Sequence, residues 1–439
     1  MERSDLEARG YLVTPGFIDL HAHLREPGFE DSETIASGAR AALRGGFTTI
    51  CAMPNTEPAI DSPGLVTEVI VRGKAAAAAR VLPIATITRG RAGRELSDLI
   101  ELAAAGAIAF SDDGSPVDDA QLFRHAMEYA RTKDLLIIEH AQDLAMSGKG
   151  VMHEGVVSAR LGLPGIPSAA EEAAVARDIS IAEMTGARLH LTHVSTRGAI
   201  ASIRVAKARG IRVTCDVTPH HLAMTDDWVA GSRAFAWERE GSRARVETAT
   251  QDGGPLSERE QARFERESPR APTPPAPTAT PYDSATKVNP PLRGLSDVRA
   301  LWEGLADGTV DAIATDHAPH ASVKKDVEFD QAAFGISGLE TALSLLLGGV
   351  NAGWGDRDTV IRALTTGPAG ILGLALPDDD WIAIDPDTEW TVTADAFVST
   401  GKNTPLMGRT LRGRVVYAVV GGEVRYEGGL RGATPVGSR

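Results

Sequence analysis

The chain has 439 residues, of which 43% are hydrophobic and 24% are charged, so it can bury a large core. Its formal net charge of -14 argues against nucleic acid and anionic membranes as partners. Two cysteines, Cys51 and Cys215, are too few for a disulfide scaffold, and their apolar surroundings are typical of buried thiols.

The first residues are charged and lack the apolar core of a signal peptide, and no apolar run is long enough to span a bilayer. We therefore expect a cytoplasmic protein with no membrane partner. From Phe17 onward, short β-branched runs alternate with longer alanine-rich segments. Strands are predicted at residues 17–21, 47–53, 81–88, 107–110, 135–138, 188–192, 211–215 and 310–314. Helices are predicted at 33–44, 64–80, 120–132, 169–185 and 196–208.

Eight strands that alternate with helices predict an α/β fold, a (β/α)8 TIM-type barrel, which we place at residues 14–374. Residues 231–281 interrupt the pattern, because they are rich in Arg, Glu, Pro, Thr and Ser and predict a flexible insertion. A surface insertion is favoured there over a lid on the active site. After Leu374, short strands are predicted at 383–384, 390–392, 415–420 and 423–426. With residues 1–13, residues 375–439 would form a small β appendage.

Histidines and aspartates stand where predicted strands end, namely His21, His23, Asp112, Asp113, His140, His193 and Asp316. In a barrel all these ends meet at the carboxyl-terminal rim, where the chemistry takes place. One such histidine is more often a hydrogen-bonded core residue, and one such aspartate is often a helix cap. The coincidence of so many favours a metal site of the zinc type.

Four histidines and two aspartates, with one of the adjacent Asp112 and Asp113 counted, make six protein ligands, which are too many for one catalytic zinc with its roughly three ligands and an open position. They suit two metals bridged by a carboxylate and a hydroxide derived from water. The reaction that this arrangement predicts is metal-assisted hydrolysis.

Eight segments together resemble a known family: PGFIDLHAHLREPG, GGFTTICAMPNT, FSDDGSPV, TPHHL, KVNPPLRG, DGTVDAIATDHAPH, FGISGLET and GKNTPLMG. The chain resembles the amidohydrolase superfamily and, within it, the dihydroorotases of the bacterial type I class. The resemblance implies a barrel with a small β-sandwich appendage. It also implies the third step of pyrimidine (UMP) synthesis, the reversible hydrolysis of (S)-dihydroorotate to N-carbamoyl-L-aspartate.

The resemblance assigns a role to each predicted ligand. His21 and His23 would bind the first of two Zn²⁺ ions, His140 and His193 the second, and Asp113 would bridge them. Asp316 would contact the first metal and act as general acid/base, taking a proton from the bridging hydroxide and giving it to the leaving amide nitrogen.

The same resemblance implies substrate contacts by Arg25, Asn55, Asn289 and His320 and by the backbone at Phe334 and Gly335. Arg25 suits a carboxylate because its planar guanidinium can bind two oxygens at once. A surface ion pair is the alternative for Arg25, and a turn-shaping role is the alternative for Asn55 and Asn289. We interpret His220 and His221 as structural residues behind the ligands, and His125 and His153 have no strand-end context.

Relatives of the hydantoinase type, and many allantoinases, carry a carboxylated lysine where this chain has Asp113, which favours a dihydroorotase. The alternatives are another cyclic amidohydrolase, namely an allantoinase or hydantoinase, or a non-catalytic partner of aspartate carbamoyltransferase. Family members imply a homodimer and an association with that transferase as further partners. They also carry several dozen residues before the His-x-His pair, where this chain has about twenty, so we expect an incomplete appendage or an upstream start.

Overall fold

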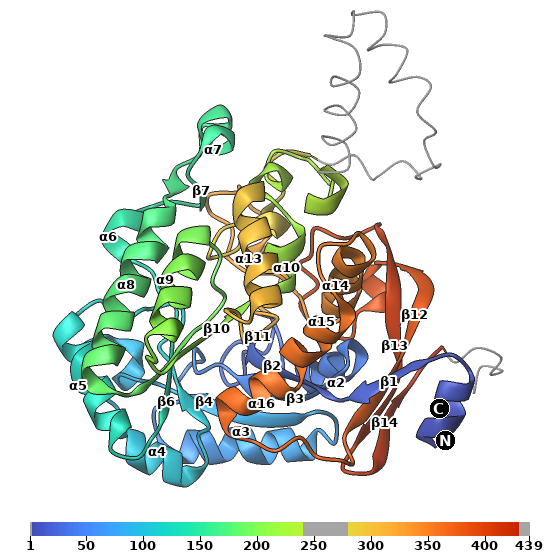
Figure 1. Cartoon of the computed structure of the whole chain (residues 1–439), viewed down its shortest axis with the longest axis horizontal. Helices are drawn as coiled ribbons and strands as arrows, with labels where there is room; N and C mark the ends of the chain where they lie inside the picture. The colour runs from blue at the N-terminus through green and yellow to red at the C-terminus, as the bar shows by residue number, and fades with distance from the viewer. Residues whose placement is uncertain (1, 240–279, 430–439) are drawn as a thin grey trace, which may run out of the picture.

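A parallel eight-stranded sheet forms the centre of the computed structural model, which describes residues 2–239 and 280–429 (Figure 1). Its strand order is β11-β10-β9-β6-β5-β4-β3-β2. A parallel bridge joins Ala22, at the end of β2, to His317, which lies beyond β11. The backbone N–H of His23 also donates to the carbonyl of His317 at 2.8 Å. The first and last strands therefore meet, and the sheet closes into a barrel.

Each barrel strand begins within two residues of a predicted strand, so the barrel prediction is confirmed. The strands are β2 (Phe17–Ala22), β3 (Phe47–Ala52), β4 (Arg80–Ala85), β5 (Ala109–Phe110), β6 (Leu136–Glu139), β9 (Arg188–Leu191), β10 (Val213–Val217) and β11 (Ala312–Ile313).

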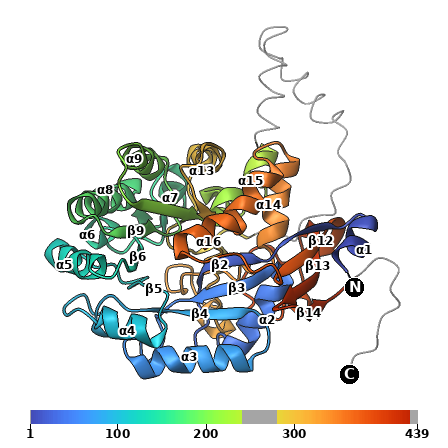
Figure 2. The ribbon, with the colours of Figure 1, turned by 60° about the horizontal axis from the view of Figure 1, so that its bottom comes forward.

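Helices surround the barrel, with α3 and α4 on one side and α8, α9 and α13 on the opposite side (Figure 2). Threonines begin two of them, because Thr34 Oγ1 accepts from the N–H of Ser37 and Thr196 Oγ1 accepts from that of Ala199. The helices that surround the strands are α2 (Ile35–Gly45), α3 (Pro63–Ala75), α4 (Leu99–Ala105), α5 (Ala120–Arg131), α8 (Ser168–Thr185), α9 (Arg197–Ala208), α13 (Leu295–Asp307), α14 (Ala342–Asn351), α15 (Arg357–Leu364) and α16 (Thr366–Leu372).

Alternation along the strands produces two apolar layers. Within β2, Ile18 and Leu20 belong to one buried cluster, together with Cys51 of β3, while Phe17 belongs to a second, larger cluster that includes residues of the helices. Both cysteines are buried free thiols, as the sequence predicts. The barrel interior is therefore a packed core, and polar side chains collect at its rim.

Two excursions extend the rim of the barrel. The first, between β6 and α8, contains α6 (Leu144–Ser147), β7 (Met152–His153), α7 (Val156–Leu161) and β8 (Gly165–Ile166), and α7 projects away from the barrel (Figure 1). The second follows β10 with α10 (Pro219–Ala223) and leads into the predicted insertion. Phe235 and Ala236 are buried, so residues 231–239 belong to the packed fold rather than to a flexible segment. Residues 240–279, which make up most of the predicted insertion, lie outside the described residues.

A four-stranded antiparallel sheet of order β1-β12-β13-β14 forms the appendage beside α2 and α14 (Figure 1). Its elements are α1 (Arg3–Ala8), β1 (Leu12–Pro15), β12 (Trp381–Thr391), β13 (Thr410–Val420) and β14 (Glu423–Glu427). The prediction of separate strands at 383–384 and 390–392 is wrong, because β12 runs through both with a register shift between Asp385 and Glu389.

The appendage is joined to the barrel by a polar contact inside an apolar interface. Ser344 of α14 donates its hydroxyl to the carbonyl of Gly413 at 2.6 Å, and Trp390 donates its indole N–H to that hydroxyl at 3.1 Å. The domain boundaries at 13/14 and 374/375 stay a prediction, and β1 crosses the first of them. Within residues 2–239 and 280–429, no helix has both the length and the apolar character needed to cross a membrane.

Candidate metal centre

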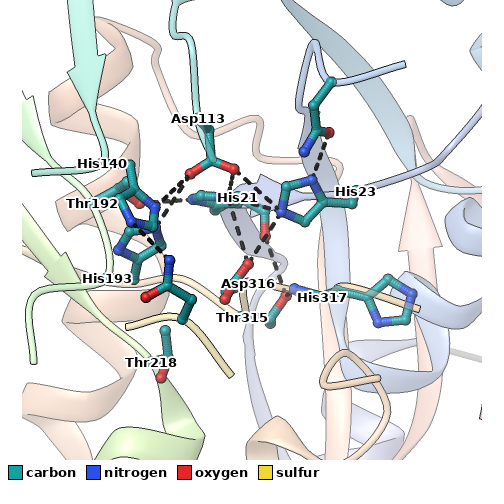
Figure 3. A network of polar contacts seen from close by, with 12 residues as sticks. His21, His23, Asp113, His140, Thr192, His193, Thr218, Thr315, Asp316 and His317 are labelled. Atoms are coloured by element: carbon teal, nitrogen blue, oxygen red, sulfur yellow. Dashed lines mark hydrogen bonds and ion pairs between the residues drawn. The ribbon is translucent and has the colours of Figure 1, made fainter. Parts of the chain in front are cut away.

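The six predicted ligands lie together at the carboxyl-terminal ends of five barrel strands (Figure 3). His21 is the last residue but one of β2 and His23 follows that strand, Asp113 follows β5, His140 follows β6, His193 follows β9 and Asp316 follows β11. All six are buried. Asp112 points elsewhere, because its carboxylate accepts from the backbone N–H groups of Ile87 and Thr88.

The first group consists of His21, His23 and Asp316, whose ligand atoms lie within 4.8 Å of one another. Asp316 Oδ1 is 3.2 Å from His23 Nε2 and 3.6 Å from His21 Nε2. The two Nε2 atoms are 3.2 Å apart. These distances leave a position between the three side chains at which one cation could be bound.

The second group is built around Asp113. Its Oδ1 is 3.3 Å from both His140 Nδ1 and His193 Nε2, and its Oδ2 is 3.5 Å from His21 Nε2 and 3.6 Å from His23 Nε2. One carboxylate therefore faces both groups of histidines (Figure 3). This is the geometry that a bridging ligand needs.

Hydrogen bonds on the outer side of the rings fix which nitrogens face inward. Thr192 Oγ1 donates to Asp216 Oδ2 at 3.1 Å, so it must accept from His21 Nδ1–H, which is 2.8 Å away. His23 Nδ1–H donates to Asn55 Oδ1 at 2.8 Å. When both rings are neutral, as metal ligands must be, both Nε2 atoms carry lone pairs, and these face each other at 3.2 Å. A cation between them removes this repulsion, so the donor set fits a metal.

His140 is oriented in the same way by two amides. Its Nε2–H donates to Gln142 Oε1 at 2.8 Å, which leaves the lone pair of Nδ1 facing Asp113. Asn289 Nδ2 donates to the same Gln142 oxygen at 2.8 Å. The Oδ1 atom of Asn289 is buried and has no hydrogen-bond partner within the described part of the chain.

Charges within the cluster shift its pKa values in opposite directions. Burial alone would raise the pKa of Asp113, but the charges and hydrogen bonds of His21, His140 and His193 hold that pKa well below its usual range. Burial would lower the pKa of His21, but Asp113 and Asp316 raise it to about 9. The site thus attracts positive charge, and a divalent cation would take the place of protons.

The predicted substrate residues lie around this cluster. Arg25 Nε donates to the carbonyl of Pro319 at 3.2 Å, and His320 Nε2–H donates to the carbonyl of Phe334 at 2.7 Å. Gly335 has a φ of 137°, and a Cβ there would lie 2.6 Å from Ala318 Cβ. Arg25, His320 and the backbone at 334–335 are therefore neighbours, whereas Asn55 and Asn289 contact predicted ligands.

Three of these residues have a left-handed backbone that side chains disfavour. Arg25, His193 and Asp316 have φ values of 61°, 40° and 46°. Such conformations cluster at functional sites, where the surrounding structure holds them in place. This observation supports a functional site independently of residue type.

Several residues that contact the predicted ligands or substrate residues were not predicted from the sequence, chiefly Thr192, Asp216, Gln142 and Asn403. Asp216 lies inside an apolar strand and is fully buried, and an acid in that context is the one signal that could have indicated a role. His221 is structural, as predicted, because its Nδ1 accepts from Thr218 and its Nε2–H donates to the carbonyl of Pro290 at 3.0 Å.

Comparisons with known proteins agree with this geometry. A family model described as Dihydro-orotase-like matches residues 10–199. Dihydroorotase from Anaeromyxobacter dehalogenans (strain 2CP-C) is 48% identical over 430 residues, covering 97% of this chain and 88% of the relative. Dihydroorotase from Pelotomaculum thermopropionicum is 45% identical over 426 residues, covering 95% and 88%.

Solved structures with the same fold include two hydantoinases. L-Hydantoinase (dihydropyrimidinase) from Arthrobacter aurescens has a TM-score of 0.73 at 22% identity, covering 96% of this chain and 87% of that one. D-Hydantoinase (dihydropyrimidinase) from Thermus sp. has a TM-score of 0.68 at 22% identity, covering 95% and 85%.

The barrel, the cluster at its rim and these relatives define a cyclic amide hydrolase of the amidohydrolase superfamily, whose members depend on metals. Identity with the two bacterial relatives extends over nearly the whole chain. The chain belongs to the dihydroorotase family.

Proposed function

We propose that this protein is a zinc-dependent dihydroorotase, which interconverts (S)-dihydroorotate and N-carbamoyl-L-aspartate in pyrimidine synthesis. The observation that carries the proposal is the position of Asp113 between two groups of histidines. Relatives of the hydantoinase type use a carboxylated lysine at this strand end. The names and identities of the bacterial relatives support the same choice.

His21, His23 and Asp316 would hold one cation, His140 and His193 a second, and Asp113 would contact both. Imidazole nitrogens and carboxylate oxygens in these numbers suit zinc. Bound there, the two cations would polarise the amide carbonyl of the substrate and lower the pKa of the attacking water.

Asp316 is the proposed general acid/base. Its buried carboxylate takes a proton from the attacking water while the water oxygen bonds to the ring carbonyl carbon. As the carbon–nitrogen bond of the ring amide breaks, Asp316 gives that proton to the leaving nitrogen. Its Oδ1 lies 3.2 Å from His23 Nε2, so the carboxylate stands beside the residues that would hold the first cation.

Arg25 is the proposed partner of the substrate carboxylate. Burial lowers its pKa to about 10, so the guanidinium remains charged at neutral pH. Its Nε donates to the Pro319 carbonyl and its Nη2 lies 3.4 Å from His320 Nε2, and the remaining N–H groups of Nη1 and Nη2 would make a two-point contact with the carboxylate. The free Nδ2 side of Asn55 and the ring of His320 would complete this end of the substrate site.

The test is hydrolysis of dihydroorotate by the purified, zinc-loaded protein, with allantoin and hydantoin as parallel substrates. We expect turnover of dihydroorotate to exceed that of both others by at least about 100-fold, because a site built for a carboxylate rejects analogues that lack it. Preferential turnover of hydantoin or allantoin would refute the proposal. Zinc content, measured on the same preparation, separates a wrong substrate from an unloaded site.

A further inference from the structure

The loop at residues 401–404 belongs to the appendage but lies against the rim of the barrel. The backbone N–H of Gly401 donates to the carbonyl of Ser32 at 2.9 Å. A Cβ at Gly401 would lie 2.6 Å from the backbone nitrogen of His320, so glycine is needed for this close approach. The appendage therefore reaches the segment that follows Asp316.

Asn403 stands at the centre of this contact, is 9% exposed, and makes four hydrogen bonds through its side chain. Its Oδ1 accepts from the backbone N–H of His320 at 2.8 Å and, at 3.1 Å, from Ser337 Oγ, which shares its one proton with the carbonyl of Gly401 at 2.7 Å. Its Nδ2 donates to the carbonyls of Ala318 at 3.2 Å and Gly335 at 2.9 Å. These four bonds use the full capacity of the amide.

The two segments that Asn403 joins are the ones expected to face the substrate. Residues 318–320 carry His320 and the carbonyl that supports Arg25, and residues 334–337 carry the backbone at Phe334 and Gly335. A cavity of about 550 Å³ opens beside them and is lined in part by His320 and Asn403.

We propose that Asn403 is a positioning residue, through which the appendage sets the spacing between residues 318–320 and 334–337 and so the affinity for the substrate. The affinity part of this inference rests on the proposed dihydroorotase function. Asn403 touches neither the predicted ligands nor Arg25, so its effect acts through the backbone of the two segments.

Asn403→Asp is the sharpest perturbation, because it changes the amide without changing its shape. The acceptor for His320 and Ser337 remains, but an oxygen replaces the nitrogen that faces two carbonyls at 2.9 and 3.2 Å. Two hydrogen bonds become two repulsive contacts, so the segments should move apart. Asn403→Ala removes all four bonds without adding repulsion and serves as the second variant if the first folds poorly.

The experiment combines steady-state kinetics on dihydroorotate with hydrogen–deuterium exchange in the zinc-loaded protein. For Asn403→Asp we expect KM to rise about tenfold or more, which corresponds to the loss of one good hydrogen bond, while kcat changes less than about threefold and zinc content is unchanged. Exchange should increase in peptides that cover 318–321 and 334–338. Asn351→Asp, at the exposed end of α14, makes the same chemical change and should alter none of these values.

An unchanged KM in both Asn403 variants, or unchanged exchange in both peptides, would overturn the inference. A lower melting temperature with unaltered KM would also overturn it, because Asn403 would then serve stability alone. If the unaltered protein fails to hydrolyse dihydroorotate, the proposed function fails. The exchange measurement still decides in that case whether Asn403 holds the two segments together.

Discussion

Thr192 links a predicted ligand to a buried carboxylate, and its removal measures how much the orientation of His21 contributes to metal binding. Thr192→Val keeps the shape of the side chain but removes the oxygen that lies 2.8 Å from His21 Nδ1. The ring is 1% exposed, so water cannot replace that acceptor. An unpaired buried donor costs about 1–3 kcal/mol.

That cost falls mainly on the metal-bound state. With a cation at Nε2, the ring proton must stand on Nδ1, whereas in the metal-free state the ring can place its proton on Nε2, facing Asp113 at 3.5 Å. A tenfold change in affinity corresponds to about 1.4 kcal/mol, so we expect zinc to bind about 10- to 100-fold more weakly in Thr192→Val.

Competition with a chelator of known zinc affinity measures the change. Thr214→Val is the matched control, because Thr214 Oγ1 contacts His190 at 2.9 Å, behind the same Asp216, but does not contact a predicted ligand. Asp216→Asn should weaken zinc binding as well, and the double variant with Thr192→Val should be less than additive because Thr192 acts through Asp216. Equal zinc affinity in Thr192→Val and Thr214→Val would refute the reasoning.

Three further changes test the proposed chemistry and the electrostatics of the fold. Asp316→Asn should lower kcat by at least about 1000-fold while metal stays bound, and near-normal turnover would exclude Asp316 as the acid/base. Arg25→Met should raise the KM for dihydroorotate about tenfold or more, because a charged hydrogen-bond pair is lost, and an unchanged KM would remove Arg25 from the substrate site. Burial lowers the pKa of His221 to about 4, so between pH 6.5 and 4 the unfolded chain takes up a proton that the folded chain does not. Stability therefore falls as pH falls through this window. Urea titrations at pH 7 and pH 4 measure this effect. Between these pH values, the unfolding free energy of His221→Gln should decrease by about 3 kcal/mol less than that of the unaltered protein. Equal decreases in the two proteins would contradict the assignment.

The barrel could be predicted because its signals are local. Each strand is a short apolar run bounded by polar residues, so a few neighbouring residues are enough to indicate it. The appendage strand β12 could not be predicted in the same way. Asp385-Pro386-Asp387 has the composition of a turn, and the sheet absorbs it as a bulge between Asp385 and Glu389. Pairing with β13, which is distant in sequence, decides this conformation.

The ligand set could be placed at the rim because strand ends coincide in a barrel, but the contacts behind the ligands could not. Thr192 follows β9 and carries no signal of its own, and Asp216 lies in β10, where a buried acid indicates a role but not its partner. Their hydrogen bond depends on the register in which Cys215 of β10 pairs with Leu191 of β9. Asn403 is harder still to predict, because it contacts His320, 83 residues away in sequence, from the loop between β12 and β13.

Three residues at the rim of the barrel have a strained backbone conformation. Arg25, His193 and Asp316 stand where the chain turns sharply out of the barrel, with φ values of 61°, 40° and 46°. Glycine would adopt these conformations without strain, whereas each larger residue costs about 1 kcal/mol or more. A guanidinium, an imidazole and a carboxylate stand there instead, and glycine could supply none of them. His193 and Asp316 belong to the buried groups of predicted ligands and Arg25 is the proposed partner of the substrate carboxylate, so the strained positions are ones that the proposed chemistry uses, and selection for stability alone would not have kept them.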